Sequence, residues 1–334
     1  MTTNAVSVPP ALGRARTLVD PALRAAVAGL DPANRAISEY HLGWTEADGT
    51  PRERAGGKAV RPAVAILAAE ACGGSPERAV PGAVSVELIH NFSLIHDDVM
   101  DEDAERRHRP TVWALWGIPA AILSGDALQN LAQQVLLPCD PRASIALGEA
   151  VSELIRGQTE DLAFERRDWV ELPECRAMAA GKTGALLSAS ARIGALLGGG
   201  DDSAVDALST YGAHVGMAFQ WVDDVLGIWG DPAVTGKPVL SDLRGRKKSL
   251  PVTFVLSAGG GSARAIGDWL AGSEVLDLPR VADVLEEAGA REWALAEAGR
   301  EVDLANQALD SVPLTESARD ELKELTRFLT HREA

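Results

Sequence analysis

The sequence is poor in cysteine and in aromatic residues. Three cysteines occur among 334 residues; they lie far apart, and none belongs to a CxxC pair. An odd number of isolated cysteines argues against a disulfide framework, and without CxxC or HExxH motifs a structural zinc site is not expected. Two Tyr and five Phe are present, whereas Ala and Leu are abundant, and this composition favours helix.

Long hydrophobic runs and excess positive charge are also missing. No eighteen consecutive apolar residues occur, so no transmembrane segment is expected. The N-terminal sequence has no apolar stretch of the signal-peptide type, which indicates a cytoplasmic location. The formal net charge is −16, and an acidic surface argues against binding to nucleic acid. An anionic substrate must therefore be attracted locally, by metal ions or by clustered Lys and Arg.

Helical periodicity extends over most of the chain. From Val60 onwards, apolar residues recur at helical spacing between short turns, and strand-like alternation is scarce. We expect residues 1–19 to form a flexible N-terminal tail, followed by a helix that starts near Asp20-Pro21. Residues 20–334 are then predicted to form a single all-α domain of consecutive helices, with a loop over residues 41–57.

Two of the expected helices carry an Asp-Asp pair beside an apolar stripe. In the first, Asp97 and Asp101 lie one turn apart, next to Asp98; the second contains Asp223 and Asp224. Carboxylates one turn apart repel each other unless water surrounds them or a cation lies between them. A single pair fits a solvated helix face equally well. Two pairs on amphipathic core helices favour Mg²⁺, which commonly joins one or two carboxylates to substrate phosphates and water.

Basic residues lie near these acidic segments and before the first helix of the periodic region. Lys58 and Arg61 stand at an expected helix start, where anions are favoured. Arg106 and Arg107 close the first acidic segment, and Arg suits bidentate contact with phosphate. GKTG at 181–184 is not a nucleotide-binding P-loop, because the upstream Gly of that motif is missing. The pattern indicates a diphosphate held between metal ions and cationic side chains.

These motifs resemble those of the trans-isoprenyl diphosphate synthases, also called polyprenyl synthetases. HDDVMDEDAERRHRPT resembles the family's first aspartate-rich motif and the arginine pair after it. FQWVDDVLGIWGDPAVTGKPVLSDLRGRKKSLP resembles the second motif and the lysine segment that follows. GGKAVRP, ELIH, GDAL, GQTEDL and GKTG stand before and between them in the family's order. The resemblance covers residues 55–255.

The resemblance implies an isoprenoid synthase-like helical bundle around a deep central cavity. The implied enzyme is an Mg²⁺-dependent prenyltransferase with three Mg²⁺ ions per active site, and a homodimer. It would condense isopentenyl diphosphate with dimethylallyl, geranyl or farnesyl diphosphate.

The resemblance also implies roles for individual residues. The metal ions would be bound by Asp97, Asp101 and Asp223, supported by Asp98 and Asp224. The allylic diphosphate would be contacted by Arg106, Lys182, Thr183, Gln220, Lys237 and Lys247. Isopentenyl diphosphate would be held by Lys58, Arg61, His90 and Arg107. The space where the carbocation forms would be lined by Gln158, Thr183 and Gln220. The catalytic set is then Asp97, Asp98, Asp101, Arg106, Lys182, Asp223, Asp224 and Lys237.

The sequence departs from the family pattern at four positions. Gly227 replaces the third Asp of the second motif. Asp223 remains, so we expect metal binding to survive with weaker support. The other departures are Ala59 in place of an Arg, Arg246 in place of the Gly before Lys247, and Ser249 in place of a Thr.

Product length is expected to depend on residues just before the first motif. In the family a bulky residue at the position of Phe92, five residues before Asp97, limits the tail, although helical geometry turns it about 140° away from Asp97. Ser93 shares the Asp97 face and is small, so a growing tail can pass it. The motif also lacks the insertion of typical bacterial farnesyl members. We therefore predict a C20 product, geranylgeranyl diphosphate, with a farnesyl or longer product as the alternative.

Two further functions remain as alternatives. A class I terpene cyclase shares a helical fold and a DDxxD motif. It needs no isopentenyl diphosphate pocket, however, and its second metal motif, N/D-D-x-x-S-x-x-x-E, is missing from this sequence. A non-catalytic subunit of a heteromeric prenyl synthase would be expected to have lost aspartates of the first motif, and all three are present. A catalytic, chain-elongating enzyme is therefore the prediction.

Overall fold

The computed structural model describes residues 8–52, 57–231, 240–272 and 277–331, which form helices and one short hairpin. The helices before the hairpin are α1 (Pro10–Val27), α2 (Pro32–His41), α3 (Val60–Ala71), η1 (Pro76–Ala79) and α4 (Val80–Met100). The hairpin strands are β1 (Glu105–Arg106) and β2 (Arg109–Pro110). Then follow α5 (Val112–Trp116), α6 (Ile118–Leu136), α7 (Pro141–Glu165), α8 (Leu172–Ala179), the π-helical turn η2 (Ala180–Gly184), α9 (Ala185–Gly198) and α10 (Asp202–Trp229). The last helices are α12 (Ser241–Arg244), α13 (Leu250–Ala258), α14 (Gly260–Leu270), α15 (Leu278–Glu287), α16 (Ala290–Asp310) and α17 (Glu316–Thr330). The predicted all-α fold is confirmed.

The prediction of a flexible tail over residues 1–19 is wrong for residues 10–19. Helix α1 begins at Pro10, a residue suited to a first turn because the N–H that it lacks would be unpaired there. Leu12 and Val19 are buried on one face of α1, and Pro21 lies inside the helix instead of starting it. Residues 1–7 lie outside the described ranges.

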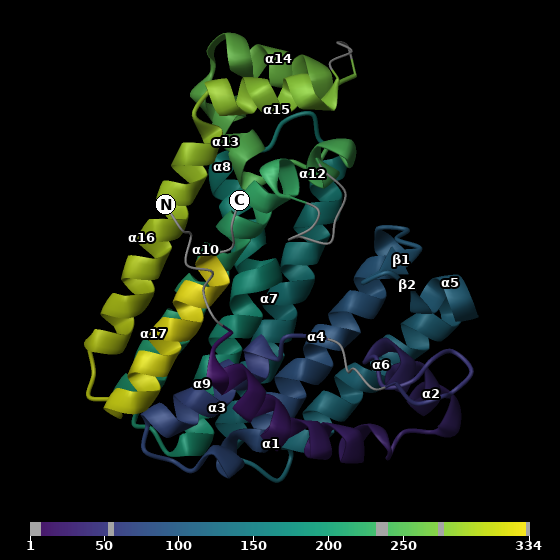
Figure 1. Ribbon diagram of the computed structural model, residues 1–334, viewed down its shortest axis with the longest axis vertical. Helices are drawn as coiled ribbons and strands as arrows, with labels where there is room; N and C mark the ends of the chain where they lie inside the picture. Colours follow the sequence, from purple (N-terminus) through teal and green to yellow (C-terminus); the bar gives the residue numbers. More distant parts are fainter. Residues whose placement is uncertain (1–7, 53–56, 232–239, 273–276, 332–334) are drawn as a thin grey trace.

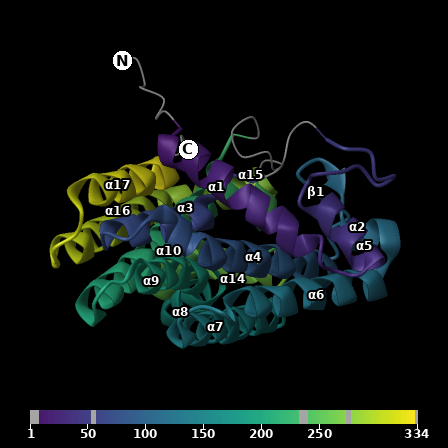
Figure 2. The same cartoon turned by 90° about the horizontal axis from the view of Figure 1, so that it is seen from below.

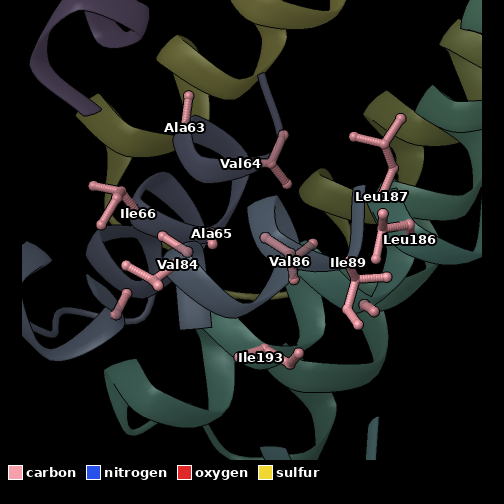
Figure 3. Close-up of a cluster of buried hydrophobic side chains, with 14 of the residues drawn as sticks. Ala63, Val64, Ala65, Ile66, Val84, Val86, Ile89, Leu186, Leu187 and Ile193 are labelled. Carbon is pink, nitrogen blue, oxygen red and sulfur yellow. The ribbon is translucent and has the colours of Figure 1, made fainter. Parts of the chain in front are cut away.

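The centre of the molecule is built from α3, α4, α9 and α10 (Figure 1). Side chains from α3, α4 and α9, among them Ile66, Ile89 and Ile193, meet in one apolar cluster (Figure 3). Glycine allows α9 to approach α3 closely. A Cβ added at Gly194 would lie 2.8 Å from the carbonyl carbon of Ala65 and closer still to its oxygen. This contact fixes the core against which α4 and α10 are placed.

The two acidic segments lie at the C-terminal ends of α4 and α10. Figure 1 shows α4 running towards the β1–β2 hairpin, while α10 leads towards α12. Viewed from below, α7, α8 and α9 lie on one side of the bundle and α1 on the other (Figure 2). Within the described ranges, no helix is both long and apolar enough to cross a membrane.

Candidate active site

The first acidic motif closes helix α4. Asp97 and Asp98 lie in the last turn, and the Asp101 N–H donates to the Asp97 carbonyl at 2.8 Å. The Asp98 side chain is 1% exposed and accepts a 2.6 Å hydrogen bond from Arg106 Nε. Its other oxygen, Oδ2, is buried and has no hydrogen-bond partner among the described residues. Asp98 Oδ2 is therefore a buried oxygen that could accept a further hydrogen bond or bind a cation.

Burial disfavours the ionised form of the carboxyl groups in this motif. It raises the pKa of Asp97 to about 6, with a further contribution from the charge of Asp101, while Lys182 opposes the shift. Burial likewise raises the pKa of Asp98 to about 6 against the opposing charge of Arg106. Ionised carboxylates under such strain are stabilised by an added cation. The donor set of oxygens alone fits Mg²⁺.

A strained two-residue turn presents the arginine pair. Arg106 pairs with Arg109 across the hairpin, which leaves Arg107 and His108 as the turn residues. Both have positive φ, 53° and 59°, as a type I′ turn requires, although glycine or asparagine is the usual choice. Non-glycine residues held in this region often mark functional sites. Here the turn directs a guanidinium towards the middle of α4.

Arg107, which is exposed, acts electrostatically on the half-buried side chains of Arg61 and His90, and the three make a cluster rich in positive charge. Burial lowers the pKa of Arg61, and Arg107 adds to this effect, whereas Glu87 opposes it. Burial and the charges of Arg61 and Arg107 hold the pKa of His90 well below its usual range. Arg61 Nε is buried without a hydrogen-bond partner in the described part of the chain. Such a cluster is suited to an anion.

Lys58 stands just before this cluster. The next residue, Ala59, is the N-cap of α3 and has a left-handed conformation, with φ 53°. The ammonium of Lys58 lies 5.7 Å from the ring centroid of Phe328. Lys58 and Arg61 therefore flank the helix start, as the sequence predicts.

The second acidic motif is tied to the GKTG segment. Asp224 is 7% exposed and accepts hydrogen bonds from the Leu250 N–H at 2.9 Å and from Gln220 Nε2 at 2.6 Å. Thr183 Oγ1 donates to Gln220 Oε1 at 2.6 Å. Burial raises the pKa of Asp224 to about 7, and the charge of Asp242 contributes. The structure thus joins Thr183, Gln220 and Asp224 in one network.

GKTG forms the π-helical turn η2, a distortion that occurs frequently at functional sites. Lys182 Nζ donates to Asp161 Oδ2 at 2.6 Å. A Cβ at Gly157 would lie 2.9 Å from the carbonyl carbon of Gly181 and closer still to Lys182 N, so glycine lets α7 approach the turn. The neighbouring Gln158 is 6% exposed, and neither amide atom has a partner among the described residues.

Two lysines act on the first acidic segment, and one of them also interacts with Asp242, whose charge acts on Asp224 of the second segment. The charge of Lys182 acts on Asp97 of the first motif. The pKa of Lys247 is raised: desolvation lowers it, but the carboxylates of Asp242, Asp161 and Asp101 outweigh that effect. Both motifs, α7 and the segment after α12 therefore share one electrostatic site.

The described residues contain no group of three or more His, Cys, Asp or Glu side chains that could hold a metal ion by themselves. Asp223 is half-buried on α10, next to Asp224. Lys237, also predicted for the site, lies outside the described residues.

A pocket of ≈ 130 Å³ lies beside the hairpin and is lined by Tyr40, His41, Arg106, Arg107 and Arg109, among others. Arg109 forms its wall: the guanidinium lies 3.9 Å from the Tyr40 ring centroid and donates to the carbonyl of Tyr40 at 2.9 Å. Asp98, Arg106 and Arg107 are the three members of this lining that the sequence singled out.

Sequence reasoning missed three carboxylates of the site. Asp161 lies one turn after Gln158 in GQTEDL, and Glu87 lies one turn before His90 in ELIH, so both had a local signal. Asp242 had none, because the residue that it contacts, Gly227, is fifteen positions away.

Comparison with known proteins agrees with this geometry. Residues 52–286 match the polyprenyl synthetase family. A (2E,6E)-farnesyl diphosphate synthase of Mycobacterium tuberculosis is 51% identical over 335 residues, covering 97% of this chain and 93% of the relative. A geranylgeranyl diphosphate synthase of the same species is 44% identical over 262 residues, 75% of each chain. The crystal structure of a polyprenyl synthetase from Streptomyces coelicolor A3(2) has a TM-score of 0.91 at 49% identity, covering 96% of this chain and 98% of that one.

The chain is a helical bundle with two acidic motifs, and Lys182 and Lys247 act on the first of them; these are the features of a prenyl chain-elongating synthase, a transferase of the trans-prenyltransferase type. The chain belongs to the polyprenyl synthetase family, the trans-isoprenyl diphosphate synthases.

Proposed function

We propose that the protein is a farnesyl diphosphate synthase, which makes the C15 product. Support comes from the farnesyl diphosphate synthase that is 51% identical over nearly the whole of both chains. The geranylgeranyl diphosphate synthase of the same species is less similar and matches a smaller part of the chain. The C20 product expected from the sequence is thus less well supported than its C15 alternative.

The packing of Phe92 is compatible with a short product. Phe92 is buried and packs edge-to-face on His96, with the ring centroids 4.8 Å apart. His96 Nε2 in turn lies 3.0 Å from the carbonyl oxygen of Ile122 on α6. Phe92 thus packs on a histidine that is itself fixed against α6, and a ring held in this way could stop a growing tail. Ser93, also buried, donates from Oγ to the His90 carbonyl, and its small side chain leaves room for a tail on this face of α4.

We assign Asp97, Asp101 and Asp223 to the binding of Mg²⁺ that accompanies the allylic diphosphate. Burial raises the pKa of Asp97, and a bound cation would favour its ionised form; Oδ2 of the neighbouring Asp98 is buried without a hydrogen-bond partner among the described residues. Bound Mg²⁺ would stabilise the negative charge that develops on the departing diphosphate. Asp98 and Asp224 then orient the site through Arg106 and Gln220.

The protein's own residues promote cleavage of the allylic C–O bond. The diphosphate leaves with the electron pair, and its growing charge is stabilised by fixed cations. These are Arg106, Lys182 and Lys247, with Lys237 outside the described residues. The amide of Gln158 and the Thr183–Gln220 pair offer dipoles to the allylic cation. An apolar cavity that excludes water protects the cation until it reacts.

The cluster of Lys58, Arg61, His90 and Arg107 is assigned to isopentenyl diphosphate. A neutral His90 donates a hydrogen bond without adding charge, and Arg61 has a buried N–H to offer. The double bond of the bound isopentenyl group attacks the allylic cation and a new C–C bond forms; the resulting cation then gives up a proton to the released diphosphate, and a new double bond forms. The product keeps the diphosphate of the isopentenyl unit.

We also propose that the protein is a homodimer that associates through α6. Ile118, Ile122 and Leu123 on this helix are 49%, 44% and 61% exposed. Contiguous exposed apolar side chains of this kind mark protein interfaces. Figure 2 shows α6 along one side of the bundle, remote from α16 and α17. Because Ile122 also receives His96, the interface would support the stop formed by Phe92.

The 51% identity to a farnesyl diphosphate synthase over nearly the whole of both chains is the observation that carries the proposed function. The test is incubation of the purified protein with Mg²⁺, isopentenyl diphosphate and each of the C5, C10 and C15 allylic diphosphates. We expect linear C15 product from the C5 and C10 primers and no extension of the C15 primer. A linear C20 product would restore the expectation from the sequence. A cyclic hydrocarbon formed without isopentenyl diphosphate would identify a cyclase, and absence of turnover would point to a non-catalytic subunit.

A further inference from the structure

Position 227 has no side chain, but its space is filled by another residue. A Cβ added at Gly227 would lie 2.8 Å from Oδ1 of Asp242 and closer still to Cγ and Oδ2. The Asp242 carboxyl group therefore rests directly on the Gly227 backbone, in the place where the third residue of the second acidic motif would begin. Glycine is the residue that allows this approach.

Helix α12 fixes the carboxyl group there. Leu243, the next residue, is fully buried and packs in the same apolar cluster as Ile228 of α10. On its other side, Ser241 Oγ donates to the Gly227 carbonyl oxygen at 3.3 Å. Asp242 is thus held over Gly227 by both of its neighbours.

From this place Asp242 reaches both sides of the site. Its charge acts on Asp224 of the second motif and on Lys247. Its carbonyl oxygen also accepts a 2.9 Å hydrogen bond from the Lys247 N–H, which ties the lysine segment to α12. One carboxylate therefore connects the acidic helix with a cation assigned to the allylic diphosphate.

We propose that Asp242 supplies the carboxylate missing at position 227, and that Gly227 is the space that lets it do so. The inference rests on the function proposed above and makes Asp242 a positioning residue for Lys247 and for the Mg²⁺-bound diphosphate. Positions 227 and 242 can then hold one carboxylate between them. One carboxylate in this place supports diphosphate binding, whereas two would collide and repel each other. The departure at Gly227 is therefore compensated within this chain.

A double-mutant cycle tests the proposal. Asp242→Ala, Gly227→Asp and the combined variant are compared with the wild type for calorimetric affinity towards inorganic diphosphate in Mg²⁺. Thermal stability without Mg²⁺ is measured in parallel. Each single change should weaken the affinity about tenfold, and the combined variant should return to within about threefold of wild type, because residues that share one place are strongly non-additive. Gly299→Asp is the matched control, since nothing lies within 4 Å of a Cβ at that helical glycine.

Asp242→Asn separates charge from shape. We expect its thermal stability without Mg²⁺ to stay at the wild-type value while its diphosphate affinity falls, since the amide fills the same space without the charge. Full affinity in this variant would make Asp242 a packing residue and overturn the proposal. Additive losses in the combined variant, or wild-type affinity in Gly227→Asp, would overturn it as well. Wild-type protein that binds diphosphate but forms no prenyl product would instead count against the proposed function alone.

Discussion

Arg106 donates from Nε to Oδ1 of Asp98 at 2.6 Å, so the hairpin that carries the arginine pair is fastened to the helix that carries the first acidic motif. The carboxylate is 1% exposed and the guanidinium 30%. One hydrogen bond thus sets the spacing between the segments assigned to metal ions and to diphosphate. A buried carboxylate that loses such a donor retains its full desolvation cost.

Arg106→Lys should therefore destabilise the protein without Mg²⁺ by about 1–3 kcal/mol at pH 7.5, because lysine lacks the planar fork that reaches Asp98. Burial raises the pKa of Asp98 to about 6, so much of this loss should disappear at pH 5, where the carboxyl is largely protonated. Urea unfolding at the two pH values measures it. Arg142→Lys, which alters an exposed pair with Asp140, is the control and should change little. Equal losses in both variants would contradict the role of the Arg106–Asp98 bond.

The turn residues Arg107 and His108 allow backbone strain and substrate contact to be separated. Both have positive φ, so glycine at either position should stabilise the fold by about 1 kcal/mol. Arg107→Gly should nevertheless raise the KM for isopentenyl diphosphate about 10- to 100-fold, the loss expected for charge-assisted hydrogen bonds. His108→Gly should leave that KM unchanged. Steady-state kinetics with varied isopentenyl diphosphate measures both KM values. Equal KM values in the two variants would contradict the assignment of Arg107.

Asp97 should make the protein without Mg²⁺ less stable as pH rises. Burial raises its pKa from 3.8 to about 6, so the native state binds the proton more tightly than the unfolded chain. The resulting stability is fully present below pH 3.8 and is lost as pH rises through 6. Asp97→Asn removes this dependence and should be more stable than wild type at pH 8 by up to about 3 kcal/mol, with no difference near pH 3.

Thermal unfolding across this pH range measures the effect, with Asp206→Asn, exposed on α10, as the control. Mg²⁺ with inorganic diphosphate should stabilise the wild type at pH 8. The same ligands should not stabilise Asp97→Asn. Stabilisation of both proteins to the same extent would exclude Asp97 as a metal ligand.

Leu123→Glu should convert the proposed homodimer into a monomer. Leu123 is 61% exposed on α6, and a charge in the middle of an apolar interface is not paired. Light scattering after size-exclusion chromatography gives the mass directly. Leu304→Glu, at a 42% exposed position on α16, is the matched control and should leave the mass unchanged. A wild-type protein that is already monomeric would end the proposal.

Local patterns were sufficient to predict the helical architecture and the two acidic helices. Asp97 and Asp101 lie one turn apart at the end of α4, Asp223 and Asp224 are adjacent on α10, and both sets stand beside an apolar stripe, a signal that needs no knowledge of distant contacts. Helix α1 had a comparable signal in Leu12 and Val19, but Pro21 was taken for a helix start. A proline on an exposed helix face is tolerated when the opposite face is well packed, and the sequence alone does not rank these effects.

Contacts between distant segments were beyond such patterns. That Lys182 bonds Asp161, or that Asp242 fills the space over Gly227, depends on how α7, η2, α10 and α12 pack together. The π-helical form of GKTG is likewise imposed by its neighbours, since Gly157 brings α7 against its backbone. Motif resemblance supplied the members of the site, whereas packing decides which of them touch.

Phe92→Ala should lengthen the product beyond that of the wild type. Phe92 packs on His96 of the same helix, which contacts Ile122 of α6, and we expect removal of its ring to open space for a longer tail. Truncating a buried Phe costs about 3–5 kcal/mol, so product length has to be compared at a temperature where the variant is folded. Phe164→Ala is the matched control: this ring is equally buried but belongs to a separate apolar cluster with Val170. It should lose similar stability and keep the wild-type product.

Ser93→Phe should shorten the product, because it narrows the face that Ser93 shares with Asp97. Chromatography of the dephosphorylated alcohols measures all three. If Phe92→Ala leaves the distribution unchanged, Phe92 is not the stop, and chain length is set elsewhere in the bundle.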